Sequence, residues 1–308
     1  MKLSKKPKIT VICGPTASGK TKISVELAKA LGAEIISADS MQIYKELSIG
    51  TAKPSAGEMS GIKHHLIDII SVKSAADEPF SVAKYVQMAG ECAGELIKSG
   101  KKVIVCGGTG LYIDHFINNT KFAECQSDIG YREELDKLPT DRLYSLLSFT
   151  DGQSAALIHP NNRKRIVRAL EIFKMTGKTK SELDELSRPE EPAYDFVKIG
   201  LNYPDREVLY GNIDRRTDSM MAGGLADEAL KLYEGGGEAV IRKIGAIGYA
   251  ELFDCFAGLC GVGEAVEKIK QHTRNYAKRQ LTWFKRDPST LWLEPDGGCV
   301  EKCADLCR

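Results

Sequence analysis

The chain has 308 residues, which predicts about two domains and is long enough to bury a core without disulfides or a structural metal. Its composition, 43% hydrophobic and 28% charged, excludes collagen-like, coiled-coil and wholly disordered proteins. Lys and Arg number 43 against 42 Asp and Glu, and the net charge of +1 excludes a histone-like polycation while leaving room for local basic patches.

The apolar runs and the cysteines of the sequence indicate the compartment in which we expect the protein. No apolar run approaches the roughly 18 residues that cross a bilayer, and the apolar stretch at 9–13 is too short for a secretory signal. We therefore expect a cytoplasmic protein, and the nine scattered cysteines agree with a reducing compartment. Cys299, Cys303 and Cys307 lie four residues apart with no histidine near them, which favours thiols on a terminal helix over zinc ligands.

The first part of the chain alternates strand and helix patterns. Apolar runs predict strands at 8–13, 34–38 and 103–106, and apolar residues at helical spacing predict helices at 22–31 and 82–98. Alternation of this kind predicts an α/β fold in which helices flank a parallel sheet.

The middle of the chain has a different pattern. Residues 121–195 show helical spacing of leucines and no β-branched run, and a strand pattern returns only at 196–199. The sequence therefore predicts an all-helical domain at 121–195, inserted into an α/β core formed by residues 1–120 and 196–308. Residues 187–192, rich in proline and charge, are predicted to be the linker back to the core.

A phosphate-binding pattern, GxxxxGK[ST], stands between the first predicted strand and the helix after it. It comprises Gly14, Pro15, Thr16, Ala17, Ser18, Gly19, Lys20 and Thr21. In this context backbone N–H groups and the helix N-terminus cradle phosphate oxygens, Lys20 adds a positive charge, and the Thr21 hydroxyl is placed to hold Mg²⁺. The pattern makes the α/β region a P-loop core that binds a diphosphate or triphosphate, and it leaves the reaction open.

A nucleotide hydrolase would carry a further aspartate at the end of an apolar strand, whereas the strand at 103–106 ends in glycines. Asp39 and Asp68 are weak candidates for that role, and no NKxD-like base-reading motif is present. Both observations weaken a GTPase or ATPase interpretation.

Polar residues follow the predicted strands of the first half, whose carboxyl ends meet at the edge of the sheet where ligands bind. Asp39 and Ser40 follow the second strand, and Thr109 follows the third. A carboxylate and a hydroxyl beside a diphosphate suggest a proton acceptor and a donor to developing negative charge. The alternative is that Asp39 and Thr109 only cap turns or helices.

Two segments concentrate positive charge. Residues 161–180 carry seven basic side chains against one acid, and residues 268–286 carry no acid at all. In the helix predicted at 263–286, basic residues recur every fourth position at Lys270, Arg274 and Lys278. Two such segments beside a phosphate site favour a track for a polyanion, and solvated helix faces are the alternative.

Several motifs occur in order from Gly14 to Trp283. They are GPTASGKT at 14–21, ADSMQIYKELSIGTAKP at 38–54, HHLID at 64–68, GGTGLY at 107–112, RIVRALE at 165–171, AIGY at 246–249 and AKRQLTW at 277–283. Together they make the sequence similar to the tRNA dimethylallyltransferase family over nearly its whole length. Departures are mild: Cys106, Gly110 and the cysteine-bearing tail. The C-terminal zinc finger of eukaryotic relatives is absent, which suits a bacterial-type enzyme.

The resemblance implies transfer of a dimethylallyl group from its diphosphate to N6 of adenine 37, next to the anticodon, in tRNAs that read codons beginning with U. The phosphate loop would then hold dimethylallyl diphosphate and Mg²⁺ instead of the ATP that such loops commonly bind. The expected partner is the anticodon stem-loop of tRNA, with no membrane contact, and we expect the protein to be a monomer.

The resemblance also implies roles for individual residues. Asp39 is the base that receives the N6 proton, and Thr109 contacts the diphosphate. Arg216 faces the diphosphate, although Arg215 is adjacent and the motif is short. The implied tRNA contacts are Asp39, Ser40, Met41, Gln42, Lys164, Arg165, Ile166, Val167 and Arg168, with residues 245–250 as a further stretch. The charge pattern adds Arg274 and Lys278.

Three alternatives remain at this point. A related isopentenyltransferase could use free adenine nucleotides, but it would not need two basic helices. A small-molecule kinase would need ATP turnover and normally a mobile lid. A non-enzymatic RNA-binding protein would have no use for an intact phosphate loop.

Overall fold

The computed structural model describes residues 6–77, 80–122, 128–187 and 191–307. The chain divides into two compact units, a core of Met1–Ile117 with Ala193–Arg308 and a helical unit of Asn118–Pro192. The boundaries predicted at 121 and 195 lie three residues away from these. Part of the predicted linker, residues 188–190, lies outside the described residues.

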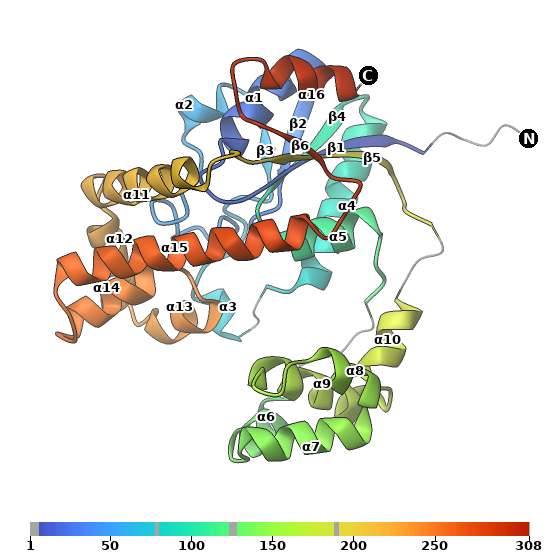
Figure 1. The fold of residues 1–308 in the computed structure, drawn as a ribbon, viewed down its shortest axis with the longest axis vertical. Helices are drawn as coiled ribbons and strands as arrows, with labels where there is room; N and C mark the ends of the chain where they lie inside the picture. Colours follow the sequence, from blue (N-terminus) through green and yellow to red (C-terminus); the bar gives the residue numbers. More distant parts are fainter. Residues whose placement is uncertain (1–5, 78–79, 123–127, 188–190, 308) are drawn as a thin grey trace, which may run out of the picture. The chain divides into compact units, whose positions relative to one another are not determined.

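The described residues of the core form a six-stranded sheet in the order β3-β2-β4-β1-β5-β6, with every pairing parallel (Figure 1). Its strands are β1 (Lys8–Cys13), β2 (Ala33–Ser37), β3 (His64–His65), β4 (Lys102–Gly107), β5 (Asp195–Leu201) and β6 (Leu291–Leu293). The predicted α/β class is confirmed. The edge strands β3 and β6 were not predicted, because two or three residues are too few to show a period.

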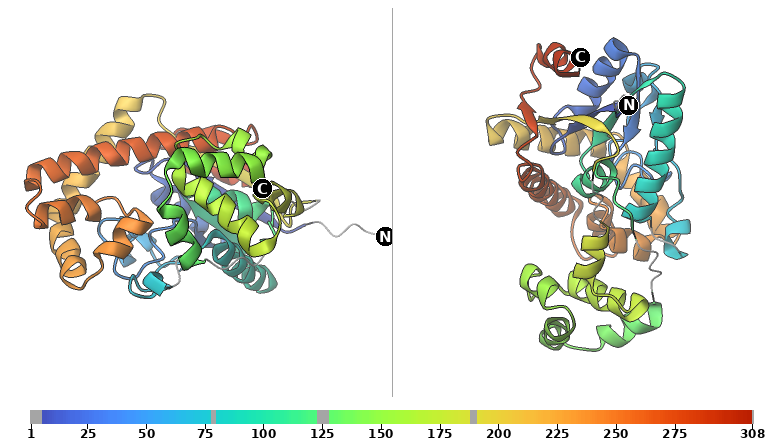
Figure 2. Two further views of the ribbon diagram at one scale, coloured as in Figure 1. Left: turned by 90° about the horizontal axis from the view of Figure 1, so that it is seen from below. Right: turned by 90° about the vertical axis from the view of Figure 1, so that its right-hand side faces the viewer.

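Helices cover both faces of this sheet (Figures 1 and 2). Those of the core are α1 (Lys20–Leu31), α2 (Ala56–Met59), α3 (Ser74–Asp77), α4 (Val82–Lys98), α5 (Gly110–Ile117), α11 (Arg206–Ala222), α12 (Leu225–Glu234), α13 (Glu238–Ile244), α14 (Tyr249–Phe256), α15 (Val262–Phe284) and α16 (Cys299–Cys307). Ile12 and Ile104 share a buried cluster with α1 and α16. Because successive side chains along a strand point to opposite faces, the residues next to them in β1 and β4 face the other layer, where α4 and α5 pack.

The C-terminal helix α16 buries its three cysteines against the sheet. Cys299, Cys303 and Cys307 belong to the same cluster as Ile199 of β5, and the Thr10 hydroxyl donates a hydrogen bond to Cys307 Sγ at 3.2 Å. Burial raises the pKa values of the Cys299 and Cys303 thiols, so both remain protonated. Thiols on a terminal helix were predicted, and the described residues contain no cluster of three metal-ligating side chains.

Lys198 lies inside the sheet, 2% exposed in β5. Its Nζ donates hydrogen bonds to Asp114 Oδ1 at 2.9 Å and Asp287 Oδ2 at 3.0 Å. Trp283 Nε1 donates to the other oxygen of Asp114 at 2.7 Å. This buried network joins β5, α5 and the end of α15, and it satisfies a charge that would otherwise be costly inside the protein.

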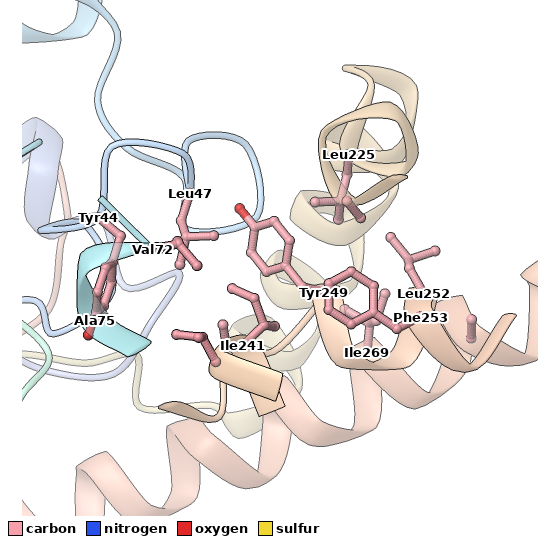
Figure 3. Packing of buried hydrophobic residues seen from close by; sticks show 14 of the residues in the cluster. Tyr44, Leu47, Val72, Ala75, Leu225, Ile241, Tyr249, Leu252, Phe253 and Ile269 are labelled. Atoms are coloured by element: carbon pink, nitrogen blue, oxygen red, sulfur yellow. The ribbon is translucent and has the colours of Figure 1, made fainter. Parts of the chain in front are cut away.

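The segment after β2 packs on the C-terminal helices. Tyr44 and Leu47 share one buried cluster with Leu225 of α12 and with Tyr249 and Phe253 of α14. Figure 3 shows the Tyr249 ring inside this cluster, with its hydroxyl directed towards the chain around Leu47. The packing holds the segment that lines the functional site.

The helical unit has its own hydrophobic core. Its described helices are α6 (Ile129–Asp136), α7 (Thr140–Thr150), α8 (Gly152–Leu157), α9 (Arg163–Thr176) and α10 (Lys180–Leu186). Leu143 and Leu147 of α7 pack with Ile166 and Leu170 of α9. In both units together, no described helix is long and apolar enough to cross a membrane.

Candidate functional site

The phosphate loop connects β1 to α1 and lines a cavity of about 860 Å³. Ala17 and Gly19 have φ angles of 61° and 79°, so the backbone turns through the left-handed region before α1 begins at Lys20. Gly14 has φ 140°, and a Cβ there would lie 2.4 Å from the Leu201 carbonyl oxygen of β5. Gly14 and Gly19 are the positions at which the motif requires glycine, whereas Ala17 adopts the left-handed conformation at a position that the motif leaves open.

The ends of β2 and β4 continue their pairing beyond the strands. Ala38 N donates to Cys106 O at 2.8 Å, and Thr109 N donates to Ala38 O at 3.0 Å. Ser40 N donates to the Thr109 hydroxyl oxygen at 3.0 Å. The structure thus brings Asp39 and Thr109 together beside the phosphate loop, as the strand order predicts.

Asp39 is half-buried and lines the cavity. Its Oδ1 accepts hydrogen bonds from the backbone N–H groups of Met41 at 2.9 Å and Gln42 at 3.3 Å. The alternative of a turn cap is therefore correct for this oxygen. Within the described part of the chain Oδ2 has no hydrogen-bond partner, so a second, basic oxygen is left for chemistry.

Lys20 is a half-buried cation in the same cavity. Its Nζ donates to the Pro15 carbonyl oxygen at 2.6 Å. Its pKa is lowered to about 8, chiefly by loss of solvent, with the Arg216 guanidinium acting in the same direction and Cys106 and Asp39 opposing the shift. A partly desolvated ammonium held only by a carbonyl is poorly compensated, so an anion bound beside it would be stabilised.

Arg216, on α11, is the second half-buried cation of the cavity. It donates to the Thr51 carbonyl oxygen at 3.3 Å, and burial lowers its pKa. Arg215 is exposed and donates to Asn212, so of the two arginines it is Arg216 that lines the cavity. Neither Lys20 nor Arg216 forms an ion pair with any carboxylate among residues 6–77, 80–122, 128–187 and 191–307.

Ser18 and Thr21 complete the loop. The Ser18 hydroxyl is fully buried and has no hydrogen-bond partner in the described residues. Thr21 lines the cavity at the first turn of α1. An unpaired buried donor beside two uncompensated cations fits a phosphate chain. The Thr21 hydroxyl could hold Mg²⁺ together with the phosphate oxygens of the ligand, since magnesium takes hydroxyl and phosphate oxygens and keeps several waters.

The other aspartate considered from the sequence is elsewhere. Asp68 pairs with Lys53, and it is not among the residues lining the cavity. Ser40, Met41 and Gln42, expected to contact tRNA, do line the cavity. The Gln42 side chain is used internally, since its Nε2 donates to the carbonyl oxygens of Thr51 and Ala52.

Three residues of the site were not assigned a role from the sequence. Tyr276 lines the cavity, and its hydroxyl interacts with Thr109 while burial raises its pKa. Gln280 bonds to the phosphate loop. The Glu228 carboxylate accepts hydrogen bonds from the Tyr249 hydroxyl and from backbone N–H groups of 48–50. Of the three, only Gln280 lies in a motif quoted above, AKRQLTW. Glu228 could have been reached only through its partner Tyr249, which lies in the AIGY motif.

The predicted tRNA contacts on α9 have unequal surroundings. Lys164 and Arg165 are exposed. The Ile166 side chain is 0% exposed in the core of the helical unit, against which Val167 also packs, so a contact of these two residues with tRNA stays a prediction that would fall to their backbone. Arg168 donates to the buried Glu171 carboxylate at 2.5 Å.

The basic face of α15 is partly neutralised. Arg274 donates to Asp214 Oδ1 at 2.6 Å, and Lys270 pairs with Asp218 at 2.8 Å. Both acids lie on α11, so the acid-free stretch seen in the sequence is not acid-free in space. Lys278 is exposed, with its Nζ 5.8 Å from the centroid of the Tyr210 ring.

Comparison with known proteins gives concordant matches. The family model for IPP transferase matches residues 42–287. A tRNA dimethylallyltransferase of Bacillus cytotoxicus is 44% identical over 312 residues, covering 100% of this chain and 96% of the relative. One from Lachnoclostridium phytofermentans is 43% identical over 289 residues, covering 92% and 91%.

Solved structures that resemble this chain come from the same family of enzymes. The full-length tRNA isopentenylpyrophosphate transferase of Bacillus halodurans is 41% identical with a TM-score of 0.71, covering 98% of this chain and 95% of that one. A eukaryotic dimethylallyltransferase, described as acting on tRNA, is 28% identical with a TM-score of 0.79, covering 94% and 74%. The chain therefore belongs to the IPP transferase family, the family of the tRNA dimethylallyltransferases.

Proposed function

We propose that the protein transfers a dimethylallyl group from dimethylallyl diphosphate to N6 of adenine 37 in tRNAs that read codons beginning with U, and releases diphosphate. The observation that carries the proposal is the pair of half-buried cations, Lys20 and Arg216, which line the cavity without a carboxylate partner in the described chain. Charges that are partly withdrawn from water are ordinarily paired. A diphosphate supplies the missing negative charge.

The phosphate loop, residues 14–21, binds the diphosphate end of the donor. Backbone N–H groups, the Ser18 hydroxyl and Lys20 contact its oxygens, and Arg216 approaches from α11. Mg²⁺, held by Thr21 and the phosphate oxygens, would neutralise part of the charge that grows on the leaving diphosphate. The Thr109 hydroxyl, which donates to Ser40 Oγ at 3.3 Å in the structure, would turn its hydrogen to the same oxygens and act as a donor where negative charge develops.

Asp39 is the base. N6 of the adenine attacks C1 of the dimethylallyl group, the bond from C1 to the diphosphate oxygen breaks, and its electron pair leaves with the diphosphate. The proton of N6 passes to Asp39 Oδ2, because Oδ1 is held by the turn to Met41 and Gln42. A positioned base of this kind contributes about 10²- to 10⁴-fold to a rate.

The acceptor is the anticodon stem-loop. Its target base must leave the stack to reach Asp39, since an enzyme that reacts at a base edge extrudes that base. The exposed cations of α9 and α15 contact the RNA phosphates and position the loop. We infer that the protein acts as a monomer, and the tRNA acceptor supports action in the cytoplasm.

The test is to incubate the protein with Mg²⁺ and labelled dimethylallyl diphosphate, adding tRNA, AMP, or ATP with a metabolite panel in separate reactions. We expect label only in tRNA, and none in a matched tRNA with guanine at position 37. Label in AMP would indicate the free-nucleotide enzyme, and ATP turnover with a metabolite would indicate a kinase. Binding of tRNA without any transfer would contradict an enzymatic function.

A further inference from the structure

Gln280 of α15 joins two loops at the carboxyl edge of the sheet. Its Oε1 accepts a hydrogen bond from the backbone N–H of Thr16 at 2.8 Å, and its Nε2 donates to the carbonyl oxygen of Gly108 at 2.9 Å. Thr16 belongs to the phosphate loop, and Gly108 immediately precedes Thr109. The residue is 6% exposed, so water competes little for these groups.

Gly108, the second glycine of the GGTG segment, leaves room for the side-chain amide of Gln280. A Cβ on Gly108 would lie 2.2 Å from Gln280 Nε2, well inside the closest approach of two such atoms. A side chain at position 108 would therefore push the amide away from the loop. The glycine lets the backbone approach Gln280, and Gln280 fixes the backbone that the glycine leaves free.

The helix that carries Gln280 is itself fixed on both sides of that residue. Towards its C-terminus, Trp283 donates to Asp114 of α5. Towards its N-terminus, Arg274 donates to Asp214 of α11, the helix that also carries Arg216. Gln280 thus lies on a helix that is fixed to α5 and to α11, and rotation of the helix cannot easily compensate for the loss of the Gln280 contacts.

We propose that Gln280 is a positioning residue that holds the phosphate loop and the Thr109 loop at a fixed separation, so that one diphosphate can contact both. The inference rests on the proposed function, since it assumes that a diphosphate bridges these loops. Gln280 acts through the Thr16 N–H group and the Gly108 carbonyl and does not itself touch the reacting atoms. Without it, the loops would each remain folded but would present their donors at unmatched positions.

The test is calorimetric titration of Gln280→Leu with inorganic diphosphate in the presence of Mg²⁺. Leu is close to Gln in volume but forms neither hydrogen bond. We expect about tenfold weaker diphosphate binding, the loss that one good hydrogen bond represents, together with a lower single-turnover rate on tRNA. Affinity for tRNA should stay within about twofold. Unchanged diphosphate affinity in the folded variant would overturn the proposal.

Phe284→Leu is the matched control. Phe284 is buried on the same helix, one turn further on, and packs beside Lys198 instead of the two loops. It should lower the thermal midpoint without changing diphosphate affinity. If both variants weaken diphosphate binding in proportion to their loss of stability, Gln280 has only a structural role.

Gln280→Glu provides a second variant that keeps the acceptor for Thr16 and loses the donor to Gly108 when ionised. Its diphosphate affinity, taken as a ratio to wild type at each pH, should be low at alkaline pH and recover as the carboxyl group is protonated. A ratio independent of pH would contradict the need for the donor. If wild type fails to bind diphosphate or to prenylate tRNA, the proposed function fails; if it does both and the variants match it, only the role of Gln280 fails.

Discussion

The cations of the cavity and the cations of the basic helices are the same residue types in opposite surroundings. All four are half-buried, so it is their partners that differ. The described residues offer Lys20 and Arg216 carbonyl oxygens in place of carboxylates. Arg168 and Arg274 are each held by a carboxylate at 2.5–2.6 Å. A positive charge in a sequence thus says little about its availability, which the structure decides through neighbours.

The difference has an energetic meaning. An unpaired charge inside a protein is costly and persists where a ligand offsets that cost, so the cavity cations are committed to an anion. A paired surface cation can contact RNA phosphates only by sharing or leaving its partner. We therefore expect large single-residue effects in the cavity and small, context-dependent effects on α9 and α15.

The largest effect is expected for the carboxylate beside the unpaired cations. Asp39→Asn keeps the turn, because the Asn side-chain oxygen can accept from Met41 and Gln42, but it removes the base. Single-turnover prenylation should fall by about 10²- to 10⁴-fold, while both dissociation constants change by less than roughly tenfold. Asp68→Asn, outside the cavity, should react normally. A near-normal rate for Asp39→Asn would leave Asp39 as a turn residue only.

Lys20→Ala should weaken binding of dimethylallyl diphosphate by at least about 100-fold, the scale of removing one partner from a buried charge contact. Affinity for tRNA should stay nearly constant, because Lys20 reaches only the diphosphate. Lys29→Ala, an exposed change on the same helix, is the control. Separate titrations with dimethylallyl diphosphate and with tRNA measure the two affinities. Equal losses of both would contradict the assignment of the diphosphate to the cavity and of tRNA to the basic helices.

The lowered pKa of Lys20 predicts a pH effect of up to about tenfold per unit. Burial brings this pKa to about 8, and the diphosphate binds the protonated form. Affinity should therefore be steady below that pH and fall as pH rises through it, with proton uptake visible by calorimetry in buffers of different ionisation enthalpy. Lys20→Arg, which stays protonated, should show a flat profile. A flat wild-type profile would show that Lys20 is charged throughout.

On α9 and α15 the effects of single substitutions on tRNA binding should be smaller, and their size should depend on whether the cation has a carboxylate partner. Arg165→Ala and Lys278→Ala remove exposed cations without a carboxylate partner in the described chain, and each should reduce the salt dependence of tRNA binding by roughly 0.7 to 0.9 in slope. Diphosphate affinity should not change. Filter binding over a salt series measures the slope, and unchanged slopes in both variants would make these residues part of a solvated face.

The smallest effect should come from removing a whole pair. Arg274→Ala alone leaves the Asp214 charge facing the RNA and should weaken tRNA binding. Arg274→Ala combined with Asp214→Ala leaves the net charge unchanged, so affinity should return to within about fivefold of wild type. A double variant as weak as the single one would show that Arg274 contacts a phosphate directly.

The parts of the molecule that could be predicted are those marked in the sequence by long apolar runs and by the fixed spacing of motif residues. The strands around β1, the phosphate loop and the approach of Asp39 to Thr109 all follow from which strands end at one edge of a parallel sheet. Arg215 and Arg216 could not be distinguished, because adjacent residues on a helix point in different directions and only packing chooses between them. The partners of Arg274 and Gln280 could not be found either, since they come from segments that fold beside α15 from far along the chain.

The buried network around Lys198 also constrains when the protein can fold. Its two carboxylates, Asp114 and Asp287, lie before and after the helical unit in the chain, and α16 at the C-terminal end packs on α1 near the beginning. The helical unit draws its hydrophobic core entirely from its own continuous segment. On the ribosome this unit has all its residues available while the core still lacks two strands, so it is the part that can fold first. The core can complete its packing only after Asp287 and α16 have been synthesised.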